Sequence, residues 1–246
     1  MLIVVASIVI QALLIVHCIK TGRNTIWIWV IALLSYAGIV AYVAVELLPE
    51  LFRSRTAQRT VRGVKKALDP EKDLRHYESQ AKLTGNVASR QRYAEELVRQ
   101  GRATEAIEVY RQTLTGLYEN DPDLMLGLAR AQFQADRASE ARATLDALIA
   151  RNPEFRSPEG HLLYARALET EGDAVRALEE YRVLASYYPG AEAAVRYAKL
   201  LRGADRKDEA RQALRDLLDH ARMAPPHYRR VQEEWLKQAE RDLGAL

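Results

Sequence analysis

Two long apolar runs come first in the chain. Residues 1–19 hold only three polar side chains, and residues 26–48 stay apolar up to Glu46. At about 1.5 Å of rise per residue, each run forms a helix of about 30 Å, which matches the hydrocarbon thickness of a bilayer. The pattern predicts a transmembrane helical hairpin over residues 1–48. A signal peptide is the alternative for the first run, but no basic residue precedes its apolar core and no small-residue cleavage pattern follows it.

Basic residues predict the orientation of this hairpin. The link between the two runs carries Lys20 and Arg23, whereas residues 49–68 carry six basic side chains against one acid, Glu50. Basic residues favour the cytoplasmic side of a membrane. We therefore expect a two-pass protein of a bacterial inner membrane, with its long C-terminal part in the cytoplasm.

Residues 49–68 alternate these basic side chains with apolar residues at helical spacing, which predicts a basic juxtamembrane helix or linker. Near an anionic leaflet, each cation gains on the order of 1 kcal/mol. The segment either contacts anionic lipid or a partner, or it only fixes the topology. The six candidate lipid contacts are Arg53, Arg55, Arg59, Arg62, Lys65 and Lys66.

Small residues recur four times between residues 86 and 226. One alanine returns at intervals of 35, 36 and 33 residues, and a second alanine follows each after twelve residues. Such a period predicts pairs of helices that cross where side chains are small and that bury their apolar surface by stacking. The first set is Ala94, Ala129, Ala165 and Ala198, and the second is Ala106, Ala141, Ala177 and Ala210.

Around these alanines the repeats read YAEELVRQGRATEAIEVY, LARAQFQADRASEARATL, YARALETEGDAVRALEEY and YAKLLRGADRKDEARQAL. They resemble the tetratricopeptide repeat family, with a turn residue seven positions after the first alanine and an aromatic residue or Leu four after the second. The third repeat matches throughout, whereas the proline comes late in the first and fourth repeats. The resemblance implies an all-α, right-handed solenoid of about four helix pairs that binds a protein or peptide partner.

Single helices are expected on both sides of the repeats. Asp69-Pro70 predicts a helix start and Gly85 a helix end, so that residues 69–85 form an adaptor helix. Residues 227–246 place apolar side chains on one helical face, as a terminal capping helix requires. These side chains are Tyr228, Val231, Trp235, Leu236, Ala239 and Leu243.

The resemblance also implies a concave groove lined by the first helix of each pair. Three of the four central positions there are basic, namely Arg130, Arg166 and Lys199. Such a row suits an extended or helical peptide that carries acidic groups, although charged residues on a solvated helix face are the alternative. The candidate groove contacts are Leu126, Arg130, Phe133, Leu162, Arg166, Glu169, Lys199 and Arg202.

One subset of the family grips the C-terminal carboxylate of heat-shock chaperones with Lys, Asn and Arg side chains. Those places hold Gln91 and Glu95 in the first repeat and Glu159 and Leu163 in the third, so the resemblance does not extend to that clamp.

A second resemblance covers the first 45 residues or so, with tryptophans, a mid-helix Gly38 and Tyr42. The segment TIWIWVIALLSYAGIVAYVAVELLPE is similar to the two-helix membrane segment of cardiolipin synthase and phospholipase D proteins. The catalytic signature of that superfamily, His-x-Lys followed by Asp, does not occur here. The resemblance therefore implies an anchor and no activity.

Composition excludes several classes of function. The net charge is +3, yet the basic excess lies in residues 49–68, and residues 69–246 carry −3, so a nucleic-acid-binding face is not expected. Cys18 is the only cysteine, which leaves no disulfide and no cysteine-based metal site. No nucleotide-binding, hydrolase or metalloprotease motif is present, and His161, expected near Arg130 or Glu169, stands without a catalytic partner. We expect neither an enzyme nor a cofactor.

Together these patterns predict a membrane-anchored scaffold that holds partner proteins at the cytoplasmic face. Two alternatives stay open at this stage. One is a regulator that senses the lipid surface through the hairpin and residues 49–68. The other is a non-catalytic regulatory subunit of a membrane enzyme, for instance one of lipid synthesis.

Overall fold

The computed structural model describes residues 2–20, 26–28, 30–31, 45 and 71–246, with the backbone alone for residues 2–10. The chain divides into two compact units, Met1–Lys72 and Asp73–Leu246.

The described part of the first unit holds helix α1 (Leu2–Lys20) and a short segment that packs against it. Cys18 and Ile31 are fully buried in one small apolar cluster, and Trp27 packs against this cluster. The side-chain amide of Gln11 donates to the carbonyl of Ile31 at 3.4 Å. The chain after α1 therefore returns along that helix.

No helix within the described residues combines the length and the apolar character that a membrane crossing needs. Most of the second expected span, residues 26–48, lies outside the described residues. So do residues 49–68 with their six candidate lipid contacts and the Asp69-Pro70 start. The transmembrane hairpin and the basic helix remain predictions.

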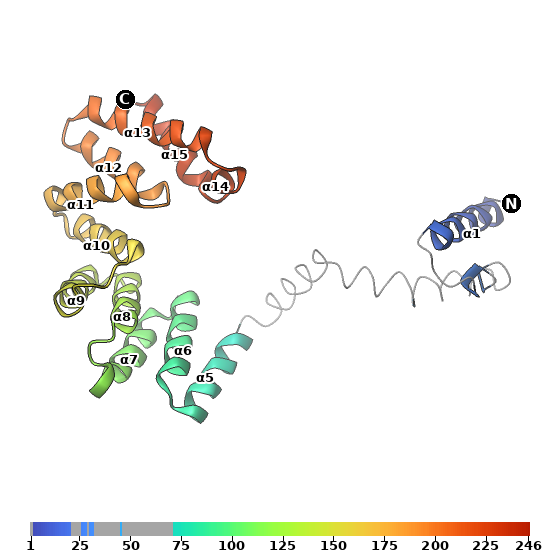
Figure 1. Ribbon diagram of the computed structural model, residues 1–246, viewed down its shortest axis with the longest axis horizontal. Helices are drawn as coiled ribbons and strands as arrows, with labels where there is room; N and C mark the ends of the chain where they lie inside the picture. Colours follow the sequence, from blue (N-terminus) through green and yellow to red (C-terminus); the bar gives the residue numbers. More distant parts are fainter. Residues whose placement is uncertain (1, 21–25, 29, 32–44, 46–70) are drawn as a thin grey trace. The chain divides into compact units, whose positions relative to one another are not determined.

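The second unit is built from helices only, among the residues that the structure describes. Four pairs stack in chain order, with α6, α8, α10 and α12 along the inner side of the curve (Figure 1). The pairs are α6 (Val87–Arg99) with α7 (Ala103–Thr113), α8 (Pro122–Gln134) with α9 (Ala138–Arg151), α10 (Pro158–Glu171) with α11 (Ala174–Tyr187), and α12 (Glu192–Gly203) with α13 (Lys207–Met223). Helices α5 (Lys72–Thr84), α14 (Pro226–Val231) and α15 (Glu233–Gly244) flank them.

The alanine pattern has the structural cause that the sequence predicts. All eight alanines of the two sets are at most 3% exposed, because each lies where the two helices of a pair cross. The residue seven positions after each first alanine turns the chain with a positive φ: 77° at Gly101, 59° at Asp136, 83° at Gly172 and 59° at Asp205. Glycine adopts this left-handed conformation freely, and Asp adopts it more readily than most other residues. The phasing of the four repeats is confirmed.

Side chains cap three of the inner helices at their N-termini. Asn86, Asp121 and Ser157 accept hydrogen bonds from backbone N–H groups three residues ahead, at 2.8, 3.0 and 3.0 Å. Each cap satisfies one of the N–H groups that a helix start leaves without a partner.

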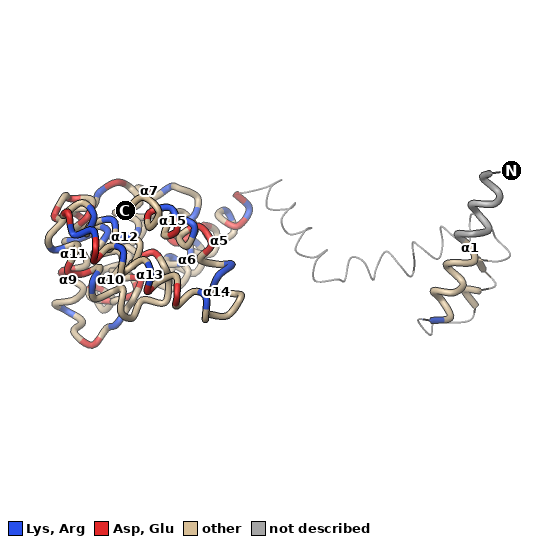
Figure 2. The backbone as a smooth tube through the Cα atoms, turned by 90° about the horizontal axis from the view of Figure 1, so that it is seen from above, with Lys and Arg blue, Asp and Glu red and all other residues tan. Residues whose placement is uncertain are grey.

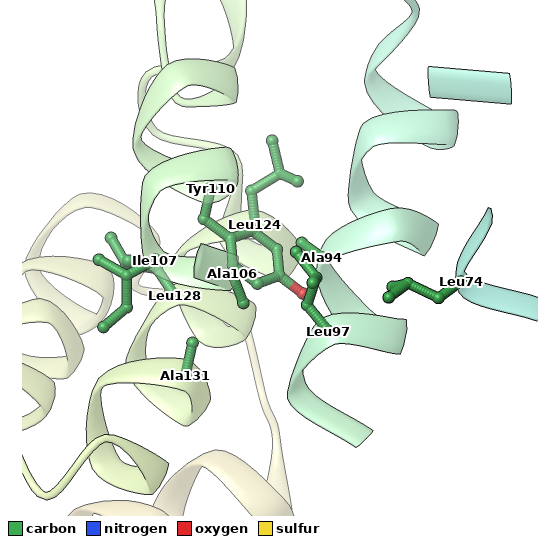
Figure 3. Packing of buried hydrophobic residues seen from close by; sticks show 9 residues of the cluster. All are labelled: Leu74, Ala94, Leu97, Ala106, Ile107, Tyr110, Leu124, Leu128 and Ala131. Carbon is green, nitrogen blue, oxygen red and sulfur yellow. The ribbon is translucent and has the colours of Figure 1, made fainter. Parts of the chain in front are cut away.

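Helix α5 joins the repeats through one buried side chain. Leu74 is 3% exposed and belongs to the same apolar cluster as Ala94, Leu97 and Tyr110 (Figure 3). The helix ends at Gly85, whose φ is 60°. A helix is thus present within residues 69–85, and its described part starts at Lys72.

Two late prolines have different structural causes. In the first repeat, α7 ends at Thr113 and the chain continues through a 3-10 turn, η2 (Gly116–Tyr118), before Pro122. In the fourth repeat, α13 simply runs on for 17 residues. The extra residues therefore form a loose turn in one case and a longer helix in the other.

The C-terminal segment differs from the single capping helix expected over residues 227–246. It consists of α14 and α15, which meet at Gln232. The backbone N–H of Ala191, before α12, donates to the side-chain oxygen of Gln232 at 3.0 Å. Ala239 is buried in the cluster with α12 and α13, but Val231, expected on the packed face, is 61% exposed.

Candidate functional site: the concave face

Two adjoining hollows lie along the inner helices. The first, of about 580 Å³, lies between α6, α8 and the loop before α10. The second, of about 640 Å³, lies between α8 and α10 and extends to the start of α12. Val98, Arg130 and Glu159 line both hollows, which makes them neighbours on one face.

The predicted groove residues divide between these hollows and the ion pairs beyond them. Leu126 lines the first hollow, Arg130 lines both, and Phe133, Leu162 and Arg166 line the second. The other three candidates, Glu169, Lys199 and Arg202, line neither and form ion pairs within the protein. Whether any of the eight contacts a partner stays a prediction.

Two of the three basic residues predicted to line the groove lie beside acidic side chains. Arg166 Nε lies 3.7 Å from Glu192 Oε1, and its guanidinium lies 4.8 Å from the centre of the Phe133 ring. Lys199 Nζ lies 3.8 Å from a carboxylate oxygen of Glu169. Arg130 has no ion pair among the described residues. The sequence pattern suggested a row of free positive charges. In the structure, Arg166 and Lys199 instead lie beside acidic side chains.

Charges of both signs surround the first hollow. Glu95, Asp123 and Glu159 contribute acids, and Arg99, Arg130 and Arg156 contribute bases. The same mixture of acidic and basic positions covers the whole second unit (Figure 2). Recognition on this face therefore depends on the position of individual side chains.

A partly buried polar network links the third pair of helices to α12. The hydroxyl of Tyr181 donates to Glu169 Oε2 at 2.8 Å. Arg196 donates to the same oxygen at 2.9 Å and to Glu192 Oε1 at 2.7 Å. The guanidinium of Arg196 also lies 5.5 Å from the centre of the Trp235 ring. Burial raises the pKa of the Tyr181 hydroxyl, while Arg196 opposes that rise.

Arg196 is the functional candidate that the sequence analysis missed. Burial by itself would lower the pKa of its guanidinium, but Tyr181, Glu192 and Glu169 raise it overall. Its spacing of four from Glu192 on one helix was the available signal.

Tyr110 occupies in the first pair the position that Tyr181 has in the third, sixteen residues after the first alanine. Its ring is 2% exposed, yet it contributes to the floor of the first hollow. Its hydroxyl points towards α6 (Figure 3) and has no hydrogen bond to any described residue. Burial and the charge of Glu95 raise the pKa of this hydroxyl, and Arg130 lowers it. Tyr110 therefore presents a hydroxyl without a protein partner to the first hollow.

His161 lies on a different face from the one expected. Its ring nitrogens lie 2.6 Å from the hydroxyl of Tyr187 and 2.6 Å from a carboxylate oxygen of Glu180, both on α11. It is thus held on the outer side of α10, away from Arg130 and Glu169. No group of three or more metal-ligating side chains occurs in the described part of the chain.

Comparison with known proteins agrees with this geometry. Residues 97–167 match the tetratricopeptide repeat family. The matched tetratricopeptide repeats run from the end of α6 into α10 and include residues of both hollows. No curated protein matches the chain.

Solved structures support the tetratricopeptide repeat fold. A crystal structure of MamA is 19% identical, with a TM-score of 0.55 over 69% of this chain and 96% of that one. MamA 41-end from Desulfovibrio magneticus RS-1 is 16% identical, with a TM-score of 0.56 over 71% and 95%. A further MamA structure is 22% identical, with a TM-score of 0.52 over 64% and 86%. These likenesses establish the fold of the repeat region.

Proposed function

We propose that this chain is a non-catalytic adaptor whose concave face captures a segment of a partner protein. The observation that carries the proposal is the pair of adjoining hollows, which open onto one face and share Val98, Arg130 and Glu159. The tetratricopeptide repeat fold supports it, because stacked helix pairs create extended concave surfaces that bind other chains.

The lining suits a peptide with apolar anchors and charged flanks. Leu126, Phe133 and Leu162 supply apolar surface along the two hollows. Arg130 and Glu159 stand at their common edge without an ion pair among the described residues, so each is available to an opposite charge. Apolar pockets provide most of the binding energy in such grooves, and the charges at the rim select orientation and partner.

The same proposal places the adaptor at the cytoplasmic face of a bacterial inner membrane. Its support is the apolar character of residues 1–19 and 26–48 and the six basic residues that follow. To test it, Cys18→Ser with Ala245→Cys leaves one exposed thiol near the C-terminus. In intact cells an impermeant maleimide should leave that thiol unlabelled, and the full chain should resist carbonate extraction while residues 69–246 do not. Labelling from outside, or release of the full chain, would refute the placement.

Site-specific crosslinking tests the groove. A photoreactive amino acid at Gln91, which lines the first hollow, should crosslink the full chain to a partner in cells. The same group at Ala143, exposed on α9, should not. Arg130→Glu should weaken the Gln91 adduct. The matched control is Arg215→Glu, at an exposed arginine of α13 that has no ion pair among the described residues.

A comparison of the full chain with residues 69–246 separates the adaptor from membrane-based alternatives. An adaptor retains its Gln91 adduct when residues 1–68 are removed, because the repeats carry the binding site. Loss of the adduct in the shorter chain, or equal adducts from Gln91 and Ala143, would argue against capture by the concave face.

A further inference from the structure

Two further hollows lie on the convex side of the repeats, between successive outer helices (Figure 1). The α9–α11 hollow, of about 580 Å³, is bounded by α9, α10 and α11. The α11–α13 hollow, of about 550 Å³, is bounded by α11, α12 and α13, with Tyr228 of α14 at one side. Both volumes are in the range of sites that take a small ligand.

The two hollows occupy equivalent positions in the third and fourth repeats. Tyr164 and Tyr197 each precede the first alanine of a repeat by one residue, and each lines one hollow from the inner helix. Tyr187 and His220 each follow the second alanine by ten residues. The same feature of the fold is thus present twice, and the side chains around it differ.

The acidic groups of the α9–α11 hollow already have partners within the protein. Glu180 lies 2.6 Å from a ring nitrogen of His161. Asp146 lies 3.4 Å from the guanidinium of Arg142. This hollow therefore offers no free carboxylate to a cationic ligand.

In the α11–α13 hollow, a base and an acid both lack an ion pair among the described residues. Arg182 stands five residues after Ala177, and Asp216 stands six residues after Ala210, so the two lie at nearly the same level on opposite walls. The side-chain amide of Gln212 donates to Asp216 at 2.8 Å, but this neutral group does not balance the charge of the carboxylate. A ligand with one charge of each sign would satisfy both walls.

Aromatic side chains favour an alkylammonium group as the cation of such a ligand. Aromatic rings attract a cation through their quadrupole, and a carboxylate adds a charge-assisted hydrogen bond. His220 and Tyr228 meet edge to face, with their ring centres 5.8 Å apart. The aromatic residues that line the hollow together with Asp216 are Tyr187, Tyr188, Tyr197, His220 and Tyr228.

The donors in the hollow favour a phosphate as the anion. A guanidinium such as that of Arg182 binds a phosphate or a carboxylate through two parallel hydrogen bonds. The hydroxyls of Tyr197 and Tyr228 and the imidazole of His220 supply further donors around the same space. A phosphate has more acceptor oxygens than a carboxylate and can use more of these donors.

We propose that the α11–α13 hollow binds an aminoalkyl phosphate, with its ammonium group beside Asp216 and the aromatic rings and its phosphate beside Arg182. This zwitterion occurs as the headgroup of a phospholipid and as a soluble phosphodiester, and the recognising chemistry is the same for both. The site lies on the convex side, so it does not rest on the capture of a peptide by the concave face.

Calorimetry on the full chain in uncharged maltoside micelles tests the proposal. Glycerophosphoethanolamine should bind with a dissociation constant on the order of 1 mM. Glycerophosphoglycerol lacks the ammonium group and ethanolamine lacks the phosphate. Each should bind at least about tenfold more weakly, because each loses one charge-assisted contact.

Charge-neutralising variants locate the two poles. Asp216→Asn should abolish the advantage of the zwitterion over glycerophosphoglycerol, and Arg182→Gln should abolish its advantage over ethanolamine. The matched controls are Glu179→Gln and Arg215→Gln, at exposed residues of the same two helices outside the hollow, and both should bind like the parent.

Nanodiscs distinguish the two sources of the ligand. The full chain is placed in discs of phosphatidylglycerol, with or without phosphatidylethanolamine. If a lipid headgroup occupies the hollow, added glycerophosphoethanolamine should bind only in discs without phosphatidylethanolamine. If the ligand is soluble, it should bind equally in both discs. Either result supports the site.

Three results would overturn the site and leave the proposed adaptor function standing. One is equal affinity for the zwitterion and its two fragments. Another is the absence of any binding at ligand concentrations up to about 20 mM. The third is full affinity for the zwitterion in both Asp216→Asn and Arg182→Gln.

Discussion

Tyr110 occupies the space that a side chain at Gly127 would need. A Cβ at position 127 would lie 2.5 Å from Cζ of the Tyr110 ring and 2.6 Å from its hydroxyl oxygen. Glycine in the middle of α8 thus has a packing cause. Its absence of a side chain lets the buried tyrosine of α7 lie against the neighbouring helix.

Gly127→Ala should destabilise the protein, although alanine is the better helix former. We expect the overpacking against Tyr110 to cost about 1–3 kcal/mol, against a helix-propensity gain of about 1 kcal/mol or less. The measurement is urea unfolding followed by circular dichroism. The control is Gly203→Ala, at a glycine of α12 where an added Cβ meets nothing within 4 Å, and this variant should be as stable as the parent or more so. Stabilisation by Gly127→Ala would contradict the close approach of Tyr110.

The two equivalent tyrosines should respond differently to loss of the hydroxyl. Tyr181→Phe removes the donor to Glu169 and should cost about 1–2 kcal/mol, because the partly buried carboxylate loses one of its partners. Tyr110→Phe removes a hydroxyl without a partner and should change stability by no more than about 0.5 kcal/mol. Equal losses in thermal or urea unfolding would show that the Tyr110 hydroxyl is paired after all.

The folding stability at alkaline pH should depend on the burial of Tyr110. Burial raises the pKa of its hydroxyl above the ordinary value of about 10. Below that pH both the folded and the unfolded chain keep the proton, and the group has no pH-dependent effect. Above it the unfolded chain releases the proton first, so the folded state loses stability by up to about 1.4 kcal/mol per pH unit.

Comparison of the parent with Tyr110→Phe isolates this contribution. The two proteins should unfold alike at pH 7 to 8, and the variant should become the more stable one above about pH 10, because it has no hydroxyl to ionise. Unfolding curves that stay parallel up to about pH 11 would show that the unfolded chain gains nothing from ionisation at this position.

The cap of α8 gives a test of the repeat phasing. Asp121 accepts from the backbone N–H of Leu124 at 3.0 Å, so Asp121→Ala should cost about 1 kcal/mol. Asp123→Ala, in the same helical turn, removes only a favourable interaction with the helix dipole and should cost a few tenths of a kcal/mol, roughly. A larger loss at Asp123 would place the helix start elsewhere.

The repeat architecture was predictable because its signals are local and periodic. The alanines at the crossings and the turn residues after them, such as Gly172, recur at fixed spacing, since every pair solves the same packing problem. The division of the C-terminal segment was not predictable in this way. The break at Gln232 coincides with a long-range hydrogen bond from the backbone N–H of Ala191 to the Gln232 side chain, and such a contact leaves no periodic trace in the sequence.

The sequence predicted which face of the repeats carries the candidate site, but not how the side chains on that face pair with one another. Arg130 and Arg166, each one position after a first alanine, line hollows of the concave face, while their contact with a partner stays a prediction. Counting cations along the row could not show that Glu192 and Glu169 lie next to Arg166 and Lys199. Nor could it distinguish Tyr110 from Tyr181, because the two have the same pattern and differ only in what surrounds the hydroxyl.

Helix α5 also has a mechanical consequence. Leu74 is its only buried side chain, whereas α8 contributes eight buried residues. Local opening of a folded protein begins where few apolar contacts must be broken. Tension applied through the chain that precedes α5 should peel this helix away before it opens the first repeat. Helix α5 would then unfold first, and the concave face formed by the four pairs would keep its shape under load.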